Sequence, residues 1–213
     1  MKTVNSSGAE RVVETAIRTN VLGLNQGMSG NISLRDGEGF LITPSAVAHE
    51  ALTPEDIVPV TFSGEWPGYK KPSSEWRFHA DIYQRHADAG AVIHAHPPWC
   101  TTLACLHREI PAFHYMVAVA GGDSIRCADY ALFGTPALSD NVLKALEGRK
   151  ACLIANHGMV CFDEDLESAL ALAMEVENLA RLYAQALSIG EPALLDDKQM
   201  AEVMERFSRY RDS

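Results

Sequence analysis

The sequence lacks several features that would assign it to a large class of proteins. No run of about 18 consecutive apolar residues occurs in the 213 residues, so no membrane-spanning helix and no membrane partner are expected. The first residues contain no apolar core of the secretory type, and we therefore expect a cytoplasmic protein. Only 18 lysines and arginines stand against 28 aspartates and glutamates, and the net charge of −10 argues against a nucleic-acid partner.

Motifs based on cysteine, glycine and lysine are also missing. The five cysteines are an odd number without a CxxC pair, and three of them lie in apolar runs, as reduced core thiols do. The segment GMSGNIS matches neither the GxGxxG dinucleotide fingerprint nor the GK[ST] of a P-loop. No lysine lies inside an apolar run, which is the setting in which a Schiff-base lysine becomes nucleophilic.

The chain alternates helical and strand patterns without repeats or breaks in composition. A first helix is expected from the capping box of Ser7 and Glu10 through Val21, and another helical stretch after AGAVIHAH through Leu106. Strands are expected at NISL and FLIT, and a helix is expected to begin near Ser73 or Ser74. The segment AGAVIHAH is predicted to be a buried strand, and CLIANHGMVCF two strands broken at the NHG triplet. The clearest helical pattern, DEDLESALALAMEVENLARLYAQALSIG, ends at Gly190. These patterns predict a single α/β domain over residues 1–213.

Three histidines stand at predicted strand ends. His94 and His96 close the run AVIHAH, and because side chains alternate in a strand, both point to the same face, about 7 Å apart. His157 lies at the break between the two later strands. A single histidine at a strand end is usually structural, whereas three neutral imidazoles with an open fourth position are the pattern of a catalytic zinc site. The residues alone leave both interpretations open.

Loops rich in small polar residues are candidates for an anion pocket. The segment KPSSEW places Ser73 and Ser74 before a helix, where hydroxyls act as caps or, with free backbone N–H groups, bind an anion. Glu75 follows in the expected first turn, where a carboxylate can ligate a metal or act as a base. His79, four residues later, shares the helical face of Glu75 and fits a surface position as well as a supporting one. GMSGNIS by itself fits a tight turn, but together with TPSA and KPSS it gives three loops that could enclose a phosphate with neutral donors.

In this combination the segments resemble the class II aldolase/adducin family. The motifs LGLNQGMSGNIS, LITPS, PSSEWRFH, AVIHAH, IPAFHYM, AGGDSI, FGT and NHG occur in that family's order and spacing, from about Ala9 to Tyr210. The resemblance is strongest to bacterial members that act on L-fuculose 1-phosphate. It implies a central, largely antiparallel sheet with helices on both faces. It also implies a homotetramer with active sites between subunits.

The resemblance further implies roles for individual residues. The implied ligands of one zinc ion per subunit are His94, His96, His157 and Glu75. Glu75 is also implied to be the catalytic base. The residues implied to surround the substrate phosphate are Gly30, Asn31, Ser45, Ala46, Ser73 and Ser74. Tyr115 matches a tyrosine that acts as an acid from a neighbouring subunit, and Phe133 and Tyr210 fall where residues that shape the substrate site are expected.

The implied reaction is the retro-aldol cleavage of a ketose 1-phosphate through a metal-stabilised enediolate. L-Fuculose 1-phosphate is the expected substrate, with dihydroxyacetone phosphate and L-lactaldehyde as products. Alternatives within the family are a sugar-acid-phosphate decarboxylase, a pentulose-phosphate epimerase and a thioribulose-phosphate dehydratase. The epimerases typically lack the glutamate, so Glu75 favours the aldolase. A non-catalytic, adducin-like interaction module lacks the zinc histidines, which this sequence retains.

Three features depart from the family pattern, one of which is the run HPPWC in place of a more polar run after His96. Met28 stands where related sequences usually have a small hydroxylic residue, and Ala46 replaces a glycine, which adds a methyl group beside the expected phosphate pocket. The metal ligands are unaffected. These departures therefore bear on the choice of sugar rather than on the type of reaction.

Overall fold

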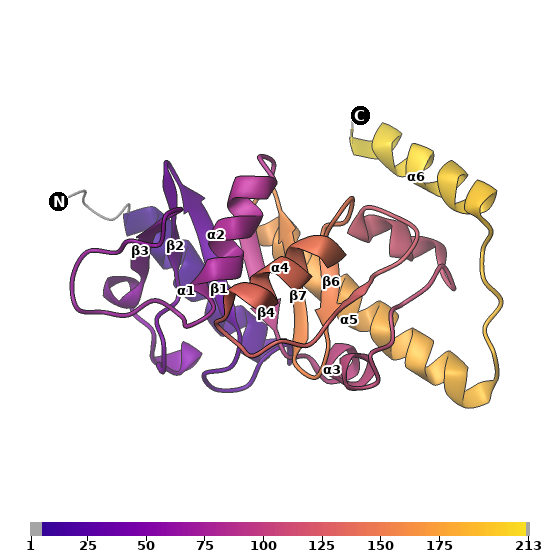
Figure 1. The fold of residues 1–213 in the computed structure, drawn as a ribbon, viewed down its shortest axis with the longest axis horizontal. Helices are drawn as coiled ribbons and strands as arrows, with labels where there is room; N and C mark the ends of the chain where they lie inside the picture. Colours follow the sequence, from indigo (N-terminus) through magenta and orange to yellow (C-terminus); the bar gives the residue numbers. More distant parts are fainter. Residues whose placement is uncertain (1–5, 212–213) are drawn as a thin grey trace.

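The computed structural model describes residues 6–211, and the side chains of residues 8–209. The helices are α1 (Ser6–Val21), α2 (Trp76–Arg85), α3 (Pro98–Cys105), α4 (Pro136–Ala145), α5 (Leu166–Ile189) and α6 (Asp197–Arg211) (Figure 1). The strands are β1 (Asn31–Asp36), β2 (Gly39–Ile42), β3 (Val58–Thr61), β4 (Ala91–Ala95), β5 (Cys127–Ala128), β6 (Ala151–Ile154) and β7 (Gly158–Asp163). Short 3-10 helices are η1 (His49–Ala51), η2 (Pro54–Asp56) and η3 (Tyr115–Ala120).

All these strands form one sheet of seven, in the order β3-β2-β1-β4-β7-β6-β5. Every pairing is antiparallel except that of β5 with β6. The prediction of a single α/β domain with a largely antiparallel sheet is therefore confirmed. β4, the strand of the AVIHAH motif, lies at the centre with β1 on one side and β7 on the other. Its backbone hydrogen bonds are thus made on both edges.

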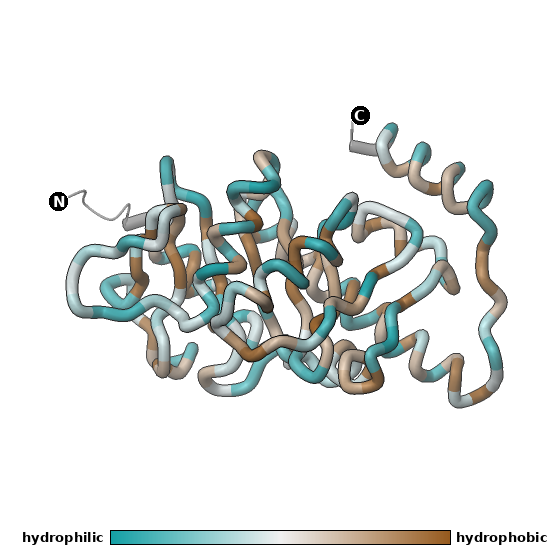
Figure 2. The backbone as a smooth tube through the Cα atoms, in the orientation of Figure 1, coloured by the Kyte–Doolittle hydropathy of each residue, from teal (hydrophilic) through white to brown (hydrophobic). Residues whose placement is uncertain are grey.

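Helices cover both faces of the sheet and create two hydrophobic cores. α1, α3 and α5 pack on one face, whereas α2 and α4 pack together on the other. Hydrophobic positions recur along the central strands, while the outer loops are largely hydrophilic (Figure 2). In β4, Ala91 and Ile93 belong to the first core and Val92 to the second. Because side chains alternate, His94 shares the face of Val92 and points toward α2, where its ring meets Phe78 edge-on at 5.4 Å between centroids.

The helix expected at Ser73 or Ser74 begins later, at Trp76, with Glu75 in the capping position. The reason lies in the preceding segment. Ser73 donates its backbone N–H to the carbonyl of Thr43, 3.0 Å away, and Pro72 forms a bridge with Pro44. These contacts hold the segment extended beside the end of β2 and delay the helix. The other expected helices and strands are present, and the two strands that flank NHG are β6 and β7.

Two helices, α4 and α6, were not predicted from the sequence. α4 starts at Pro136, with the Thr135 hydroxyl accepting the N–H of Leu138. α6 lies apart from the sheet and is joined to α5 by a connecting segment, residues 190–196 (Figure 1). α6 packs on η3. The connecting segment is held in place where the backbone N–H of Leu195 donates to the carbonyl of Ala112, 2.8 Å away.

Within residues 6–211, no helix combines the length and apolar character needed to cross a membrane. The cysteines in this part of the chain are all free thiols.

Candidate metal and catalytic site

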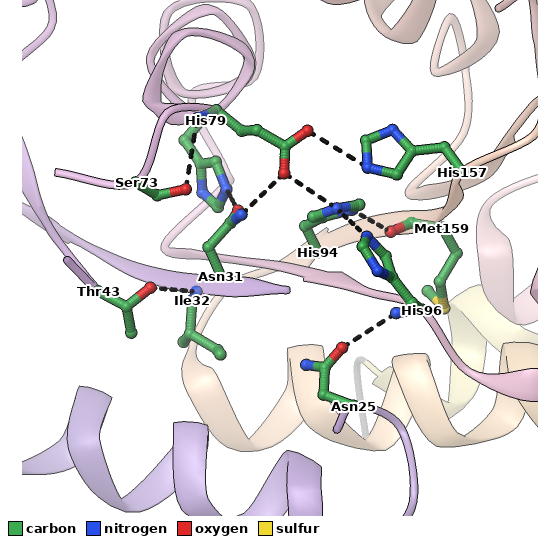
Figure 3. Close-up of polar contacts among 11 residues, drawn as sticks. Asn25, Asn31, Ile32, Thr43, Ser73, His79, His94, His96, His157 and Met159 are labelled. Atoms are coloured by element: carbon green, nitrogen blue, oxygen red, sulfur yellow. Dashed lines mark hydrogen bonds and ion pairs between the residues drawn. The ribbon is translucent and has the colours of Figure 1, made fainter. Parts of the chain in front are cut away.

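The sheet register brings three histidines together. His94 lies in β4, directly opposite Asn31 of β1 and Val160 of β7. His96 follows β4 immediately, and His157 lies in the turn between β6 and β7. Their rings turn toward one another (Figure 3), and one nitrogen from each lies within 4.8 Å of the others. The predicted convergence of these three side chains is therefore present in a single chain.

Small and polar neighbours hold the His96 segment in place. A Cβ atom on Gly158 would lie 2.4 Å from the Ala95 carbonyl and 2.7 Å from the His96 ring, so only glycine leaves room for this approach. On the other side, the buried Asn25 accepts the backbone N–H of His96 at 3.0 Å. Gly30 leaves space for Asn25, since a Cβ there would lie 2.4 Å from the Asn25 amide nitrogen.

The histidine nitrogens are suited to a cation. His94 Nδ1 lies 2.8 Å from the carbonyl of Met159, which can only accept, so Nδ1 carries the proton and Nε2 presents its lone pair. That Nε2 lies 2.9 Å from Nε2 of His96. Two lone pairs at this distance repel unless a proton or a metal ion lies between them. Neutral imidazole nitrogens are common zinc ligands, and the donor set fits a divalent metal.

Glu75 faces the histidines from the start of α2. Its Oε2 lies 3.2 Å from His94 Nε2, and its Oε1 lies 3.4 Å from His157 Nε2. Oε2 also accepts a hydrogen bond of 3.0 Å from the Asn31 amide, whereas the buried Oε1 has no hydrogen-bond partner. A buried carboxylate oxygen without a partner is costly, and a metal ion or a substrate proton would satisfy it.

The protonation of the site follows from burial and from this carboxylate. Burial alone would raise the pKa of Glu75, but His94, His157 and Asn31 together outweigh it and hold the pKa well below its usual range. Burial would lower the pKa of His94, but the Glu75 carboxylate outweighs it and raises the pKa. Burial and the neighbouring His94 lower the pKa of His96 to about 3 and that of His157 to about 4. A bound divalent cation would take the place of the His94 proton.

The loops predicted to hold phosphate lie next to this cluster. Gly30 precedes β1 with a φ of +76°, and Asn31 follows with its amide committed to Glu75. Ser45 donates to the carbonyl of Pro72 at 2.8 Å and so ties the TPSA loop to the KPSS segment. Ala46 has a φ of +60°, a left-handed conformation that favours glycine. The departure at Ala46 therefore strains the backbone, in addition to placing a methyl group there.

The serines before Glu75 are placed differently from each other. Ser73 is buried, and its hydroxyl accepts the N–H of Glu75 at 3.3 Å, while Ser74 is exposed. The Ser74 carbonyl lies beneath Gly134, where a Cβ would come within 2.8 Å of it. This contact brings the FGT loop, and with it Phe133, against the KPSS segment. Phe133 itself is 61% exposed.

Tyr115 lies away from the histidines. It begins η3, is 50% exposed, and stacks on Phe207 of α6 with a centroid separation of 6.3 Å. Among the contacts described for residues 8–209, none joins Tyr115 to the cluster around Glu75. The structure of one chain thus brings together the histidines, Glu75 and the polar loops, and leaves Tyr115 apart from them. The side chain of the other predicted tyrosine, Tyr210 of α6, lies outside the described residues.

Sequence reasoning missed some residues that support the site. Asn25 holds the backbone of His96 through a hydrogen bond. In the sequence, the only indication of this role was the presence of a polar residue within the loop LGLNQG. His79 proves to be fully buried and contacts Asn31, so the surface interpretation of His79 is wrong. Its spacing of four from Glu75 was the signal that placed both on one helical face.

Comparisons with known proteins agree with this arrangement. The sequence pattern of the Class II Aldolase and Adducin N-terminal domain matches residues 10–184. A 5-methylthioribulose-1-phosphate/5-deoxyribulose-1-phosphate aldolase of Rhodospirillum rubrum is 52% identical over 202 residues, covering 95% of this chain and 91% of that protein. An L-fuculose phosphate aldolase of Escherichia coli K12 is 48% identical over 203 residues, covering 95% and 94%. A solved structure of L-fuculose 1-phosphate aldolase superposes with a TM-score of 0.93 at 38% identity, covering 96% of this chain and 98% of that one.

Proposed function

The chain belongs to the class II aldolase and adducin family and is a class II aldolase, and we propose that it cleaves a ketose 1-phosphate reversibly into dihydroxyacetone phosphate and an aldehyde. The observation that supports this reaction is the meeting of His94, His96 and His157 with the unpartnered oxygen of Glu75. A cation site beside a carboxylate that is free to move a proton is what a retro-aldol reaction requires.

We propose that the three histidines hold one zinc ion per chain, with Glu75 as a further ligand until substrate binds. When bound, zinc supplies a Lewis acid for the negative charge that develops on the substrate oxygens as the carbon–carbon bond breaks. The histidines contribute fixed positions, because His94 is anchored by Met159 and His96 by Asn25. Met159 also selects the His94 tautomer that can ligate a metal.

Two side chains of the protein would move the protons. When the bond between C3 and C4 breaks, the C4 hydroxyl loses its proton and becomes the aldehyde, and C3 gains a proton. We assign the proton at C3 to Glu75 and the proton at the C4 oxygen to Tyr115. Glu75 reaches the usual pKa range of a proton donor only if the surrounding charges are rearranged on binding, since they hold its pKa low in this structure.

The polar loops would bind the phosphate end of the substrate. The proposed phosphate-binding residues are Gly30, Asn31, Ser45, Ala46, Ser73 and Ser74. Backbone N–H groups and hydroxyls bind phosphate without adding positive charge, which suits a chain with a net charge of −10. A phosphate held there would place the ketone of the same substrate toward the histidines. The other end of the sugar would extend toward Phe133, which borders the KPSS segment through Gly134.

The substrate class follows from what the two curated relatives have in common. Their names specify L-fuculose phosphate in one case, and 5-deoxyribulose and 5-methylthioribulose 1-phosphates in the other. These sugars share the ketose 1-phosphate end, and each lacks the hydroxyl group on its terminal carbon. We therefore propose a deoxyketose 1-phosphate, including L-fuculose 1-phosphate, which would yield L-lactaldehyde. An apolar terminal carbon suits contact with an aromatic ring such as that of Phe133.

We further propose that the enzyme is a homotetramer whose active sites lie between subunits. Tyr115 supports this arrangement, because it is half-exposed at η3 and makes no described contact with the cluster of its own chain. Tyr210 of α6 is proposed to help close the same intersubunit site.

The test is a substrate panel with release of dihydroxyacetone phosphate as the readout. The zinc-loaded protein is assayed with L-fuculose 1-phosphate, 5-deoxyribulose 1-phosphate and 5-methylthioribulose 1-phosphate. D-Ribulose 1-phosphate, which differs from the second sugar by one hydroxyl, is the matched control. We expect kcat/KM for the best deoxy sugar to exceed that of the control by about 10-fold or more. No dihydroxyacetone phosphate from any of these sugars would contradict the proposed function.

A further inference from the structure

Helix α2 and strand β1 meet along a line of polar residues with matched spacing. From the N-terminal cap of α2 onward the residues recur every four positions, as Glu75, His79 and Tyr83, and along β1 every two, as Asn31 and Ser33. Four residues of helix rise about 6 Å and two residues of strand about 6.6 Å. The spacing of these residues along the helix therefore nearly equals their spacing along the strand, and side chains from the two elements can alternate along the line where they meet.

The interleaving is a continuous chain of hydrogen bonds. From the site inward, the contacts are Glu75 Oε2 to Asn31 Nδ2 at 3.0 Å and Asn31 Oδ1 to His79 Nε2 at 2.5 Å. They continue from His79 Nδ1 to the Ser33 hydroxyl at 2.7 Å, and from that hydroxyl to Tyr83 OH at 2.7 Å. All five residues are buried, with His79 and Ser33 at 0% exposure. Figure 3 shows Asn31 beside His79 at the site end of this chain.

The chemistry of the groups fixes the direction of these bonds. A carboxylate only accepts, so Asn31 must turn its NH2 group to Glu75 and its carbonyl oxygen to His79. That carbonyl accepts in turn, so His79 must carry its proton on Nε2. His79 Nδ1 is then an acceptor for the Ser33 O–H, and Ser33 accepts from Tyr83. Every donor in the chain thus points toward Glu75.

We propose that His79 is a positioning residue for Glu75, and that it acts through Asn31. This inference rests on the proposed function of Glu75 in proton transfer. The Nε2–H of His79 prevents the Asn31 amide from turning over, which would set its oxygen against the carboxylate. The amide then binds Oε2 alone and leaves Oε1, the oxygen nearer His157, free to exchange a proton. His79 thereby gives the two oxygens of one carboxylate different roles.

The ring of His79 is itself held in one orientation. It stacks on Phe78 with centroids 4.8 Å apart and planes 20° from parallel, and on Phe40 at 6.5 Å and 14°. A phenylalanine at position 79 can keep these stacked contacts while removing both nitrogens. A glutamine can place its side-chain NH2 near the position of Nε2 and restore a donor to Asn31. These two substitutions separate packing from hydrogen bonding.

The kinetic experiment compares His79→Phe, His79→Gln and His86→Phe in the metal-loaded protein. His86 supplies the matched control, because it is the C-terminal cap of the same helix and its ring lies against Phe162, with centroids 4.4 Å apart and planes tilted by 37°. Its Nε2 has no hydrogen-bond partner among the described residues. We expect His79→Phe to lower kcat about 10-fold or more at an unchanged metal content, with KM within about threefold. His79→Gln should recover most of kcat, and His86→Phe should leave it unchanged. Equal losses in His79→Phe and His79→Gln, or no loss in either, would overturn the proposal.

A spectroscopic measurement tests the same inference without activity. In protein with ¹⁵N-labelled histidine, the His79 resonances, assigned by their loss in His79→Gln, should report a neutral ring protonated at Nε2. A ring protonated at Nδ1, or one that averages between tautomers, would overturn the inference. If His79→Phe does not fold, this measurement and His79→Gln still decide the question. Failure of the substrate panel with the expected tautomer present would instead count against the proposed function alone.

Discussion

The interior and the rim of the site are built in different ways. In the interior, His94 is fully buried and Glu75 only 7% exposed, and each is held by named hydrogen bonds to β1 or β7. At the rim, Tyr115 and Phe133 are 50% and 61% exposed, and neither has a described polar contact with the interior. Side chains held on a sheet and at a helix start can keep a metal in a fixed geometry, whereas we propose that the exposed side chains of the rim contact a neighbouring subunit.

This difference separates what one chain does alone from what we propose an assembly does. A single chain contains all the groups needed to bind a metal and to hold a base beside it. The proposed acid, Tyr115, and the proposed closing residue, Tyr210, lie on η3 and α6, which pack together away from the centre of the sheet (Figure 1). Metal binding is therefore expected to tolerate dissociation into subunits better than turnover does.

The largest effect is expected from His96→Ala, which removes one of the three proposed metal ligands of the interior. Loss of this ligand should reduce bound metal well below one ion per chain and lower kcat/KM by about 10³-fold, since the Lewis acid contributes several kcal/mol. Metal analysis of the purified variant and a cleavage assay with added zinc measure the two effects. Chelation of the wild type, followed by restoration with zinc, is the control. Full metal occupancy in the variant would remove His96 from the ligand set.

Glu75→Gln tests the chemistry of the interior without changing its shape, because a glutamine amide has the size of the carboxylate but cannot accept a proton. We expect kcat to fall about 10²-fold, the usual loss for a general base, while the fold persists. Metal content must be measured in the same sample, because Glu75 is also a proposed ligand. Turnover within about threefold of wild type would show that the base lies elsewhere.

At the rim, Tyr115→Phe should lower turnover about 10²-fold or more without lowering the metal content. Tyr69→Phe, a change to a tyrosine that is 92% exposed, is the matched control and should be neutral. Homotetramers of Tyr115→Phe and of Glu75→Gln should be nearly inactive, and tetramers reassembled from a mixture should regain part of the activity. Mixed tetramers, verified by mass, that remain inactive would place Tyr115 in its own subunit's site or outside the mechanism.

The stability of the interior should also respond to pH. Burial lowers the pKa of His79 to about 3, against about 6.5 in the unfolded chain, so below pH 6.5 the unfolded chain binds a proton that the folded chain does not. The stability contributed by neutral His79 is present above pH 6.5 and is lost as the pH falls toward 3. His79→Gln lacks this loss, and the difference between the two unfolding free energies should change by about 1–3 kcal/mol between pH 7 and pH 4.5. Urea titrations at both pH values measure it, and a constant difference would contradict the burial of a neutral ring.

The smallest effect is expected from Ala46→Gly at the edge of the phosphate pocket. The φ of +60° at this position destabilises the folded state of an alanine by about 1 kcal/mol, and glycine removes this strain. Part of the gain is offset, because glycine has more conformational entropy than alanine in the unfolded chain. We expect stability to rise by less than about 1 kcal/mol and KM for the sugar phosphate to stay equal or fall slightly. Urea unfolding and steady-state kinetics check both. A clear rise in KM would show that the alanine methyl group helps to bind substrate.

The interior could be predicted from sequence because its signals are local. His94 and His96 share a face through strand alternation, and the NHG triplet announces a turn that carries His157. The pairing of Asn31 with His94 depends on the register between β1 and β4, which are separated by more than fifty residues, so no local pattern reveals it. The burial of His79 has the same origin, because the polar partner that it needs lies on β1.

The start of α2 was harder to predict. Ser73 and Ser74 have the composition of helix caps, but a backbone hydrogen bond to Thr43 holds the segment extended, and this tertiary contact overrides the local preference. α6, in contrast, has a periodic signal in the sequence, because Met200, Val203, Met204 and Phe207 recur at helical spacing and pack against the core. The sequence reasoning did not use this signal.

The central place of β4 also has a kinetic consequence. Amide protons in a strand with neighbours on both edges exchange with solvent only when the sheet opens, so the amide of His94 should be among the slowest in the chain to exchange. Departure of a metal ion requires no such opening, since His96 and His157 lie beyond the strand ends and are partly accessible. A bound metal ion could therefore leave and return many times in the interval between two openings of the sheet. The emptied chain would keep its ligand geometry throughout and would be ready to bind metal again without refolding.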